Sequence, residues 1–349
     1  MDPSTQDHEW MARAIHLSRN GFPAPNPHVG CVIVRDNVLV GEGWHVAAGL
    51  DHAEVMALRD AGDRARGATA YVSQEPCNHW GRTGPCSEAL LSAGVSRVVF
   101  AVSDPHDKAS GGGARLASAG VEVCMGVLEA EARAENELFL QAIHRQRAKI
   151  VLKAAITADG FSARADGTSK WITGELSRAR GHHLRAELGV VIVGKGTVAA
   201  DDPALTARVE GVVNQPKPYI IDSRRELQGH YQLLENPSLR FITYRENAGP
   251  GDIGLPISQD RVLELDQLPR KLFDEGHIGA LVEGGAHTLH QFLGQGVWDE
   301  LWIFQAATLF GEGIHWAKGL SVEEVGATLV HEEAIDQDIL RVYRQCART

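Results

Sequence analysis

The stretch His52-Ala53-Glu54, followed by Pro76-Cys77 and then by Cys86, decides how the first half of this chain folds. It supplies one imidazole, two thiols and one carboxylate. Zinc binds His nitrogen and Cys sulfur readily, and a catalytic zinc site keeps three protein ligands and one open position for water. The sequence therefore predicts that the fold brings His52, Cys77 and Cys86 together around one metal ion.

Glu54 lies two residues beyond the His, where it suits a proton shuttle better than a fourth ligand. His-x-Glu followed by Pro-Cys and a second Cys is typical of zinc-dependent base deaminases, in which zinc makes water acidic enough to supply hydroxide near neutral pH. One alternative stays open from the residues alone. A purely structural zinc site would take a fourth protein ligand, for which His45 and His79 are candidates.

Hydrophobic periodicity predicts an α/β arrangement around this motif. His52 and Glu54 fall in the first turn of one expected helix, and Cys86 falls in the first turn of another. The unpaired N–H groups and positive potential at a helix start favour the thiolate form of a cysteine. Further helices are expected over residues 5–19 and, as one long helix, over 128–145. Strands are expected at 29–34, 38–40, 70–72, 97–102 and 121–124.

The bulk composition indicates a soluble two-domain protein of the cytoplasm. A chain of 349 residues is long for one core. A net charge of −11, without a basic stripe, argues against a nucleic-acid surface. No run of apolar residues is long enough for a membrane span. Five cysteines, two of them assigned to metal, suit a reducing compartment better than a disulfide framework.

A second α/β pattern begins near residue 147, which predicts domains 1–146 and 147–349. This half lacks the Gly-x-Gly-x-x-Gly of a Rossmann domain, and its Gly194-Lys195-Gly196-Thr197 lacks the spacing of a P-loop. Glu283-Gly284-Gly285 lies between an expected strand and an expected helix, where backbone amides can approach a phosphate closely. Strands are expected at 150–156, 190–193, 219–221, 280–282 and 301–304, and a helix at 286–294.

Further motifs follow in order along the chain. The first half contains NPHVGC at 26–31, His45 and EPCNHWGRTGPC at 75–86, in which eight residues separate the two cysteines where other base deaminases typically have two. The second half adds KWIT at 170–173, DDPALT at 201–206 and the Glu283-Gly284-Gly285 turn. Together these motifs resemble those of the bifunctional riboflavin-biosynthesis deaminase/reductase family over nearly the whole chain.

That resemblance implies a cytidine-deaminase-like α/β/α sandwich followed by a dihydrofolate-reductase-like α/β domain. The first domain, with one Zn²⁺ per chain, would hydrolyse the 2-amino group of 2,5-diamino-6-(5-phosphoribosylamino)pyrimidin-4-one. The second would use NADPH to reduce the ribosyl group, giving 5-amino-6-(5-phosphoribitylamino)uracil. The partner is then a small pyrimidine ribotide, with no nucleic acid and no membrane, and a homo-oligomer is expected.

The resemblance also implies roles for individual residues. Zinc would be held by His52, Cys77 and Cys86, with Glu54 moving the proton. The residues expected to bind the deaminase substrate are Asn26, His45, His79 and Arg82. Those expected to contact NADPH are Ala155, Trp171, Thr173, Thr197, Asp201, Ser223, Gly285, Ala286, His287, Thr288, Leu289, His290 and Gln291. Those expected to contact the reductase substrate are Lys153, Ser169, Arg185, Leu205, Arg208 and Glu283, and the candidate proton donors are Lys153, Asp201 and Glu283.

The chain departs from the family's pattern at five places, which are Gly84, His106, Gly189, Tyr219 and Ala307. These departures keep a second hypothesis open. The chain would then be a diverged paralogue with an active zinc deaminase domain on another pyrimidine and a non-catalytic second domain, because fold alone does not fix function.

Overall fold

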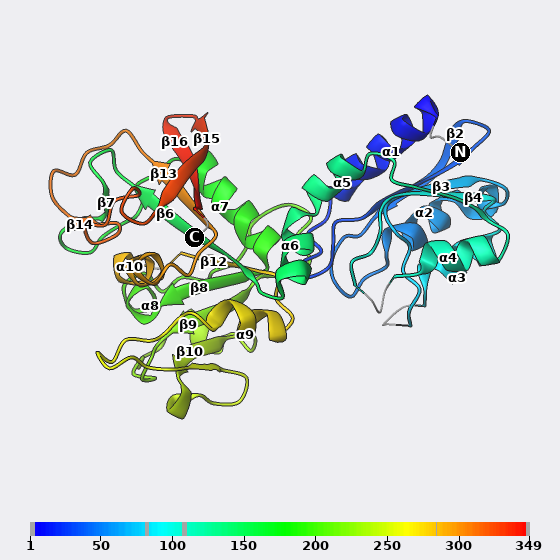
Figure 1. The fold of residues 1–349 in the computed structure, drawn as a ribbon. Coiled ribbons are helices and arrows are strands. Elements are labelled where there is room, and N and C mark those ends of the chain that lie inside the picture. The colour runs from blue at the N-terminus through cyan, green and yellow to red at the C-terminus, as the bar shows by residue number, and fades with distance from the viewer. Residues whose placement is uncertain (1–3, 81–83, 107–109, 284, 347–349) are drawn as a thin grey trace. The chain divides into compact units, whose positions relative to one another are not determined.

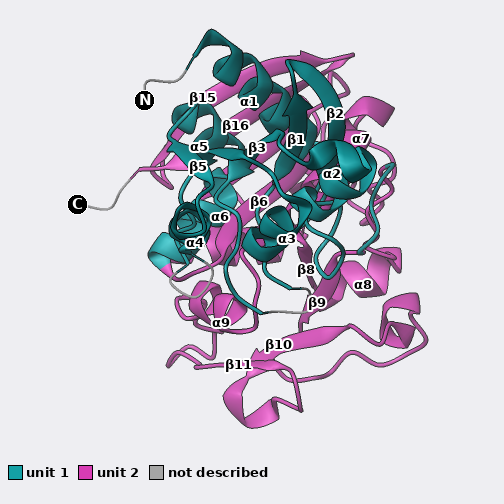
Figure 2. Ribbon diagram, turned by 90° about the vertical axis from the view of Figure 1, so that its right-hand side faces the viewer, with its two compact units in different colours: residues 1–145, 210–214 teal, residues 146–209, 215–349 magenta. Residues whose placement is uncertain are grey.

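The computed structural model describes residues 4–80, 84–106, 110–283 and 285–346. The chain clusters into two compact units, residues 1–145 with 210–214 and residues 146–209 with 215–349 (Figure 2). Each unit is built on a β-sheet with helices packed against it (Figure 1), so the α/β prediction is confirmed. None of the described helices is both long and apolar enough to cross a membrane.

Unit 1 contains a five-stranded sheet in the order β2-β1-β3-β4-β5. β1 (Gly30–Arg35) pairs antiparallel with β2 (Val38–Trp44) and with β3 (Thr69–Gln74), and β4 (Arg97–Val102) and β5 (Glu122–Met125) extend the sheet in parallel. The predicted strands of this half are therefore confirmed, with ends shifted by a few residues. The β1–β2 hairpin turns at residues 36 and 37, which both have positive φ, as a two-residue hairpin loop requires.

Helices cover both faces of this sheet. One face packs against α2 (Ala53–Ala61), α3 (Cys86–Ala93) and α4 (Gly112–Ser118). The other face packs against α1 (Thr5–Ser18) and α5 (Glu129–Glu135). This three-layer arrangement puts the starts of α2 and α3 on the same side of the sheet, where the predicted metal ligands lie.

The prediction of one long helix over 128–145 is wrong in one respect. It is divided at Asn136 into α5 and α6 (Glu137–Arg145). The backbone N–H of Asn136 still bonds back to α5, but its side chain turns away to the backbone of His28. Asn side chains compete with regular helix in this way, and periodicity alone does not report it.

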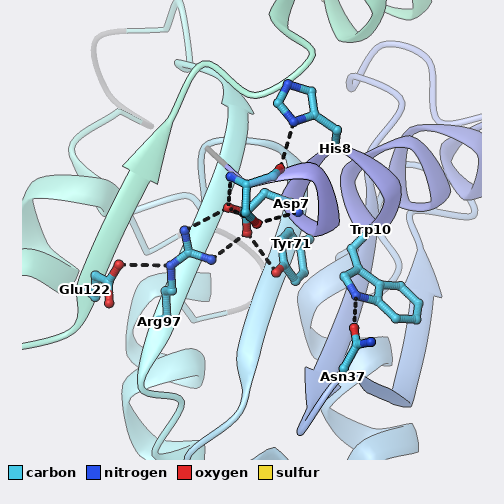
Figure 3. A network of polar contacts seen from close by, with 8 residues as sticks. Asp7, His8, Trp10, Asn37, Tyr71, Arg97 and Glu122 are labelled. Carbon is cyan, nitrogen blue, oxygen red and sulfur yellow. Dashed lines mark hydrogen bonds and ion pairs between the residues drawn. The ribbon is translucent and has the colours of Figure 1, made fainter. Parts of the chain in front are cut away.

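A buried ion pair joins α1 to the strands of unit 1 (Figure 3). The Asp7 carboxylate accepts hydrogen bonds from Arg97 Nη1 on β4 at 2.6 Å and from Tyr71 OH on β3 at 2.9 Å, and Arg97 Nε also bonds Glu122 on β5 at 3.0 Å. Asp7 in addition completes a capping box with Ser4 at the start of α1. Burial opposes the ionisation of Asp7, but the bonds from Arg97, Ser4 and Tyr71 outweigh it, so the pKa of Asp7 lies well below its usual range.

We expect Asp7→Ala to lower the free energy of unfolding of unit 1 by about 3 kcal/mol, because Arg97 loses its buried partner. Because the pKa of Asp7 is lowered by folding, its contribution is present above about pH 4 and is lost as the pH falls through the folded-state value. The difference between wild type and variant should therefore shrink in acid. Urea unfolding of both proteins at several pH values measures this difference in the free energy of unfolding. As a control, Arg13→Ala breaks the half-exposed ion pair with Glu42 and should lower the free energy of unfolding by less than about 1 kcal/mol.

Unit 2 contains, in its described part, a nine-stranded sheet in the order β11-β10-β9-β8-β12-β6-β13-β16-β15. The strands from β11 to β13 run parallel, and β16 and β15 complete the sheet in antiparallel pairing. Their bounds are β6 (Lys149–Ile156), β8 (Val190–Gly194), β9 (Lys217–Ile221), β10 (Arg240–Tyr244), β11 (Ile253–Leu255), β12 (Gly279–Val282), β13 (Glu300–Gln305), β15 (Ala327–Ile335) and β16 (Asp338–Gln345). A separate pair joins β7 (Phe161–Ala163) to β14 (Ile314–His315).

The helices of unit 2 connect these parallel strands. They are α7 (Glu175–Leu188), α8 (Lys195–Asp201), α9 (Leu268–Asp274) and α10 (Ala286–Gln295). Short 3₁₀ turns occur at Gly62–Ala65 in unit 1 and at Gln232–Glu235 and Arg245–Asn247 in unit 2. The sequence did not predict α7, which has few apolar residues, nor the β15–β16 hairpin, whose first strand is largely exposed.

Candidate functional site

The three predicted metal ligands meet in unit 1. His52 is the N-cap of α2, Cys77 follows β3, and Cys86 is the first residue of α3. His52 Nδ1 lies 3.3 Å from Cys86 Sγ and 3.6 Å from Cys77 Sγ. One nitrogen and two sulfurs so placed, with all three donor atoms within 4.8 Å of one another, fit tetrahedral zinc with an open fourth position. The prediction that His52 lies inside the first helical turn is wrong by one residue, because its backbone is extended.

The electrostatics of the two thiols suit a cation. The hydrogen bond from the Cys86 thiol lowers the pKa of Cys77 to about 4, against the effect of burial, so Cys77 is a thiolate at neutral pH. The same bond, together with burial, raises the pKa of Cys86. A divalent ion held between the two sulfurs would deprotonate Cys86 as well.

Glu54 lies beside the metal ligands without being one of them. Its side chain is 3% exposed and lies within hydrogen-bonding reach of the Cys86 thiol. Burial raises the pKa of Glu54 to about 7, although His52 nearby acts in the opposite direction. A carboxyl group with a pKa near neutrality can both accept and donate a proton at physiological pH, as a deaminase needs.

Asn26 and His45 form a hydrogen-bonded pair next to this site. Asn26 Nδ2 lies 3.0 Å from His45 Nε2, and His45 Nδ1 lies 3.1 Å from the backbone oxygen of Asp51. The ring of His45 contacts that of His52 edge-on, with centroids 5.2 Å apart. Both ring nitrogens of His45 therefore have partners in the protein, which argues against His45 as a fourth zinc ligand.

His79, another residue expected around the deaminase substrate, lies on the segment that follows Cys77. His79 has a buried Nδ1 that finds no hydrogen-bond partner in the described part of the chain, so a bound ligand could satisfy it. Arg82 lies outside the described residues. Trp80 is 83% exposed, and a Cβ at Gly84 would lie 3.3 Å from its ring, so the glycine gives this indole room. The departure at His106 is exposed and has no evident role in the site.

Glu75 is a residue that the sequence analysis quoted without giving it a role. Its Oε1 accepts hydrogen bonds from the N–H groups of Gly111 and Gly113, at 3.1 and 3.0 Å. Between them, a Cβ at Gly112 would lie only 1.7 Å from the carbonyl oxygen of Pro76. The glycine run thus packs directly on the segment that carries Cys77, and Glu75 holds it there. The position of Glu75 immediately before Pro76-Cys77 is the sequence feature that could have indicated this role.

In unit 2, four of the residues expected to bind NADPH or the ribotide follow the carboxyl ends of neighbouring parallel strands. β8 leads into α8, which carries Thr197 and Asp201, β9 leads into Ser223, and β12 leads into Glu283. The carboxyl edge of a parallel sheet is where α/β proteins bind their ligands. The fold therefore brings these residues together although the sequence separates them widely.

Arg185 on α7 and Glu283 form a two-bonded ion pair at this edge. Arg185 Nε and Nη2 donate to the two carboxylate oxygens at 2.5 and 2.8 Å, and Nη1 donates to the Thr206 carbonyl at 2.8 Å. Burial opposes the ionisation of Glu283, but the bonds from Arg185 outweigh it, so the pKa of Glu283 lies below its ordinary value. Glu283 is therefore ionised at neutral pH and has no proton to donate.

Lys153 lies in the middle of β6, close to that ion pair. Burial lowers the pKa of Lys153, with Glu283 acting in the opposite direction and Arg185 in the same one. Its ammonium group lies 5.7 Å from the centre of the Phe304 ring, and no hydrogen bond to it is found within the described residues. A half-buried lysine with a lowered pKa and unused donors is suited to proton transfer.

The turn between β12 and α10 can receive a phosphate. Gly285 is the N-cap of α10, has no side-chain cap and donates its N–H to Thr197 Oγ1 at 2.9 Å. Close approach depends on glycine, since a Cβ at Gly194 would lie 2.4 Å from Thr288 Oγ1 and one at Gly285 would lie 3.3 Å from Thr197 Oγ1. The Thr288 N–H bonds the Gly285 carbonyl at 2.9 Å, but the N–H groups that come first in a helix have no helical partner and present positive potential, so this turn fits a dinucleotide phosphate.

The other predicted residues of unit 2 differ in accessibility. Trp171 is 70% exposed, with the Arg178 guanidinium 4.7 Å from the centre of its ring. Leu205 and Leu289 are buried in hydrophobic clusters, so a ligand would meet their backbone rather than their side chains. Thr173, Ala286 and Thr288 are buried, Ala155, Ser169, Ser223, His290 and Gln291 are half-buried, and His287 and Arg208 are exposed.

Two departures in this half have structural explanations. Gly189 ends α7 in the left-handed conformation, with φ of 68°, which glycine adopts without strain. Tyr219 is fully buried in β9, and its hydroxyl lies 3.2 Å from His277 Nε2. Neither residue replaces a side chain at the carboxyl edge of the sheet. Nothing in the structure explains Ala307.

Asp338 is a residue that sequence reasoning missed. Its Oδ2 accepts hydrogen bonds from the Gly174 N–H at 2.7 Å and from Ser177 Oγ at 2.6 Å. Gly174 is the N-cap of α7 and supplies no side-chain cap of its own, so Asp338 caps the helix that carries Arg185. No local pattern could have revealed a cap that lies 164 residues away in sequence.

Comparisons with known proteins match both units. A family model described as the cytidine and deoxycytidylate deaminase zinc-binding region matches residues 4–102, and one described as the RibD C-terminal domain matches residues 148–341. Riboflavin biosynthesis protein RibD from Aquifex aeolicus is 41% identical, over 93% of this chain and 92% of its own. The Escherichia coli protein of the same name is 37% identical, over 90% of each chain.

Solved structures agree over nearly the full length. Acinetobacter baumannii RibD matches with a TM-score of 0.83 and 41% identity, covering 97% of this chain and 98% of its own. A diaminohydroxyphosphoribosylaminopyrimidine deaminase/5-amino-6-(5-phosphoribosylamino)uracil reductase from Thermotoga maritima matches with a TM-score of 0.82 and 33% identity, covering 98% and 99%. The similarity therefore includes both units and the segment that connects them.

Proposed function

The chain belongs to the family of riboflavin biosynthesis protein RibD, and from that premise we propose which of its residues carry out each of the family's two reactions. It is a bifunctional enzyme of riboflavin biosynthesis, with a zinc deaminase domain and a reductase domain. Nothing found favours a non-catalytic second domain. The meeting of His52, Cys77 and Cys86 beside buried Glu54 is the observation that carries the proposal most directly.

The deaminase acts on 2,5-diamino-6-(5-phosphoribosylamino)pyrimidin-4-one. Zinc, held by His52, Cys77 and Cys86, supplies the Lewis acidity that makes water a stronger acid. Glu54 takes one proton as the water oxygen bonds to the ring carbon that carries the 2-amino group. It passes that proton to the ring nitrogen, then takes the second proton from the hydroxyl now on the ring carbon and passes it to the amine, which leaves as ammonia. Asn26, His45, His79 and Arg82 bind the pyrimidine ribotide.

The reductase acts on the deaminated product, for which NADPH, when bound, supplies the hydride. The hydride goes to C1′ of the ribosyl group, and the sugar oxygen released from C1′ takes a proton. We assign that proton to Lys153 Nζ, because Glu283 is ionised and both of its oxygens are bonded to Arg185. Arg185, Arg208, Ser169 and Leu205 complete the ribotide site.

NADPH would lie along the carboxyl edge of the unit 2 sheet. Its phosphates would meet the Gly285 turn and the start of α10, through Gly285, Ala286, His287, Thr288, Leu289, His290 and Gln291. The nicotinamide and ribose parts would contact Ala155, Trp171, Thr173, Thr197, Asp201 and Ser223. The close packing of Gly194 against Thr288 of α10, and of Gly285 against Thr197 of α8, supports this placement of the cofactor.

We propose that residues 1–146 form the deaminase domain and residues 147–349 the reductase domain. We further propose a homo-oligomer in the cytoplasm. The free thiol of each cysteine suits a reducing compartment. β15 is an edge strand of its sheet and leaves Leu329 and Val330 about half exposed, as an edge that pairs with a second copy would. Sedimentation of the purified protein tests the oligomer.

Mass spectrometry of the purified protein with the diaminopyrimidine ribotide tests both activities at once. Without NADPH we expect loss of the amino group only, and with NADPH a further gain of two hydrogens. Deamination that never proceeds to reduction would contradict the reductase assignment. Absence of any turnover by zinc-loaded protein would contradict the substrate assignment.

Removal of zinc should separate the two reactions. Dialysis against a chelator should abolish deamination, because the three ligands surround a single ion, and added Zn²⁺ should restore it. Reduction of the deaminated intermediate should be unaffected, because the set of possible metal ligands found among the described residues, His52, Cys77 and Cys86, lies in unit 1. Parallel assays of ammonia release and NADPH oxidation measure both. A reductase that also loses activity would show that zinc supports more than the deaminase.

A further inference from the structure

The side chain of Asn136 binds the backbone of His28 through both of its polar groups. Asn136 Oδ1 accepts from the His28 N–H at 2.7 Å, and Asn136 Nδ2 donates to the His28 carbonyl at 2.9 Å. Asn136 is 3% exposed, so these bonds lie out of contact with water, where losing them is costly. It lies between the two family models, which end at residue 102 and begin at residue 148.

The backbone of Asn136 is itself held on both sides. Its N–H bonds the carbonyl oxygens of Ala132 and Arg133 in α5, at 3.3 and 3.2 Å, and its own carbonyl accepts from Leu140 N in α6 at 2.9 Å. The two short helices therefore anchor the residue between them. This explains why the predicted continuous helix is interrupted here, since the interruption releases the amide to reach His28.

His28 belongs to the loop that carries Asn26, and that loop leads directly into β1. The side chain of Asn26 has its own anchor in His45. Because the Asp51 carbonyl can only accept, His45 Nδ1 carries the proton and His45 Nε2 accepts from the Asn26 amide. Within the described part of the chain, this leaves Asn26 Oδ1 and one N–H for a ligand. His45 thus fixes which way the Asn26 amide points, while Asn136 fixes the backbone two residues further along.

We propose that Asn136 is a positioning residue of the deaminase, which holds the Asn26 loop at the place where Asn26 meets the pyrimidine edge. The proposal rests on the proposed function, in which Asn26 binds that edge. It gives the α5–α6 segment a role in substrate recognition rather than in connecting the domains. A misplacement of the loop by a fraction of an ångström would weaken the contact without touching zinc or Glu54.

A double-mutant cycle tests whether Asn136 acts through Asn26. Asn136→Ala should lower kcat/KM for ammonia release about 10-fold, mainly through KM, in the otherwise unmodified enzyme. In an Asn26→Ala background the same change should cost less than about 2-fold, because the contact it positions is already gone. Zinc content, and reduction of the deaminated intermediate, should equal those of wild type in every variant.

Gln141→Ala is the matched control. Gln141 lies on α6, and its amide donates to Glu137 Oε1 at 2.8 Å, so its loss should leave kcat/KM unchanged. If Asn136→Ala does not fold, Asn136→Asp replaces it, since it keeps the acceptor for the His28 N–H and loses the donor to the His28 carbonyl. Equal losses in both backgrounds, or no loss in either, would overturn the inference. A neutral Asn26→Ala would contradict the proposed deaminase site instead.

Discussion

Glu54→Gln is expected to lower the rate of deamination about 10³-fold while leaving zinc in place. The amide has nearly the same shape as the carboxylate but cannot take a proton from water or return one to the amine. Because the side chain is not a metal ligand, zinc content measured by atomic absorption should stay at one per chain. Reduction of the deaminated intermediate should proceed at the wild-type rate, since Glu54 belongs to unit 1 alone.

The matched control for this change is Glu88→Gln. Glu88 stands two residues after Cys86 in the first turn of α3, as Glu54 stands two residues after His52 in the first turn of α2. Its side chain is 43% exposed and pairs with Arg115 at 2.7 Å, away from proton transfer. Deamination by this variant should be unchanged within about 2-fold. If Glu54→Gln retained more than about a tenth of wild-type activity, the assignment of Glu54 as proton carrier would be wrong.

Lys153→Met is expected to lower the rate of reduction about 10³-fold and to leave deamination intact. Methionine has similar length and is apolar, so the half-buried position loses its proton donor without being left empty. The KM for NADPH should change little, because Lys153 is assigned to the sugar oxygen. Single-turnover NADPH oxidation, followed by absorbance, measures the loss.

The pH dependence of reduction provides a second readout. Burial lowers the pKa of Lys153. A proton donor works only in its protonated form, so wild-type kcat should fall as the pH rises through that lowered value, below the ordinary range of lysine. The fall should be absent from the residual activity of Lys153→Met.

Lys149→Met is the control for this strand position. Lys149 lies four residues earlier on β6 and pairs with Glu300 at 2.9 Å, so the same substitution there should affect stability but not the rate of reduction. If Lys153→Met reduced the intermediate at a near-normal rate, the proton donor would be another group, and Asp201 is the remaining candidate.

Much of the deaminase half could be predicted because its chemistry is local in sequence. His52, Glu54, Cys77 and Cys86 lie in short motifs, and the strands next to them have clear β-branched runs. The break at Asn136 could not be predicted, because it depends on a partner 108 residues away. The same limit applies to the orientation of the Asn26 amide, which is set by the tautomer of His45.

Less of the reductase half could be predicted from the sequence, because its site depends on contacts between residues that lie far apart in the chain. Glycine motifs located the phosphate turn, but the pairing of Arg185 with Glu283 joins residues 98 apart and decides which candidate can donate a proton. α7 was missed because its sequence has few apolar residues. Its buried face combines Leu184 and Leu188 with small residues such as Ser177 and Gly181, so the apolar periodicity is incomplete. Its start depends on Asp338, which lies far away in sequence.

The cap that Asp338 provides to α7 bears on how this protein can be shortened or fused. Every residue assigned to NADPH or the ribotide lies before residue 292, so the C-terminal hairpin β15–β16 looks dispensable on a map of ligand contacts. Yet that hairpin contains the carboxylate that fixes the start of the helix carrying Arg185. A truncated reductase, or a chimaera joined within the hairpin, would keep the complete set of ligand residues and lose the means of holding one of them in place.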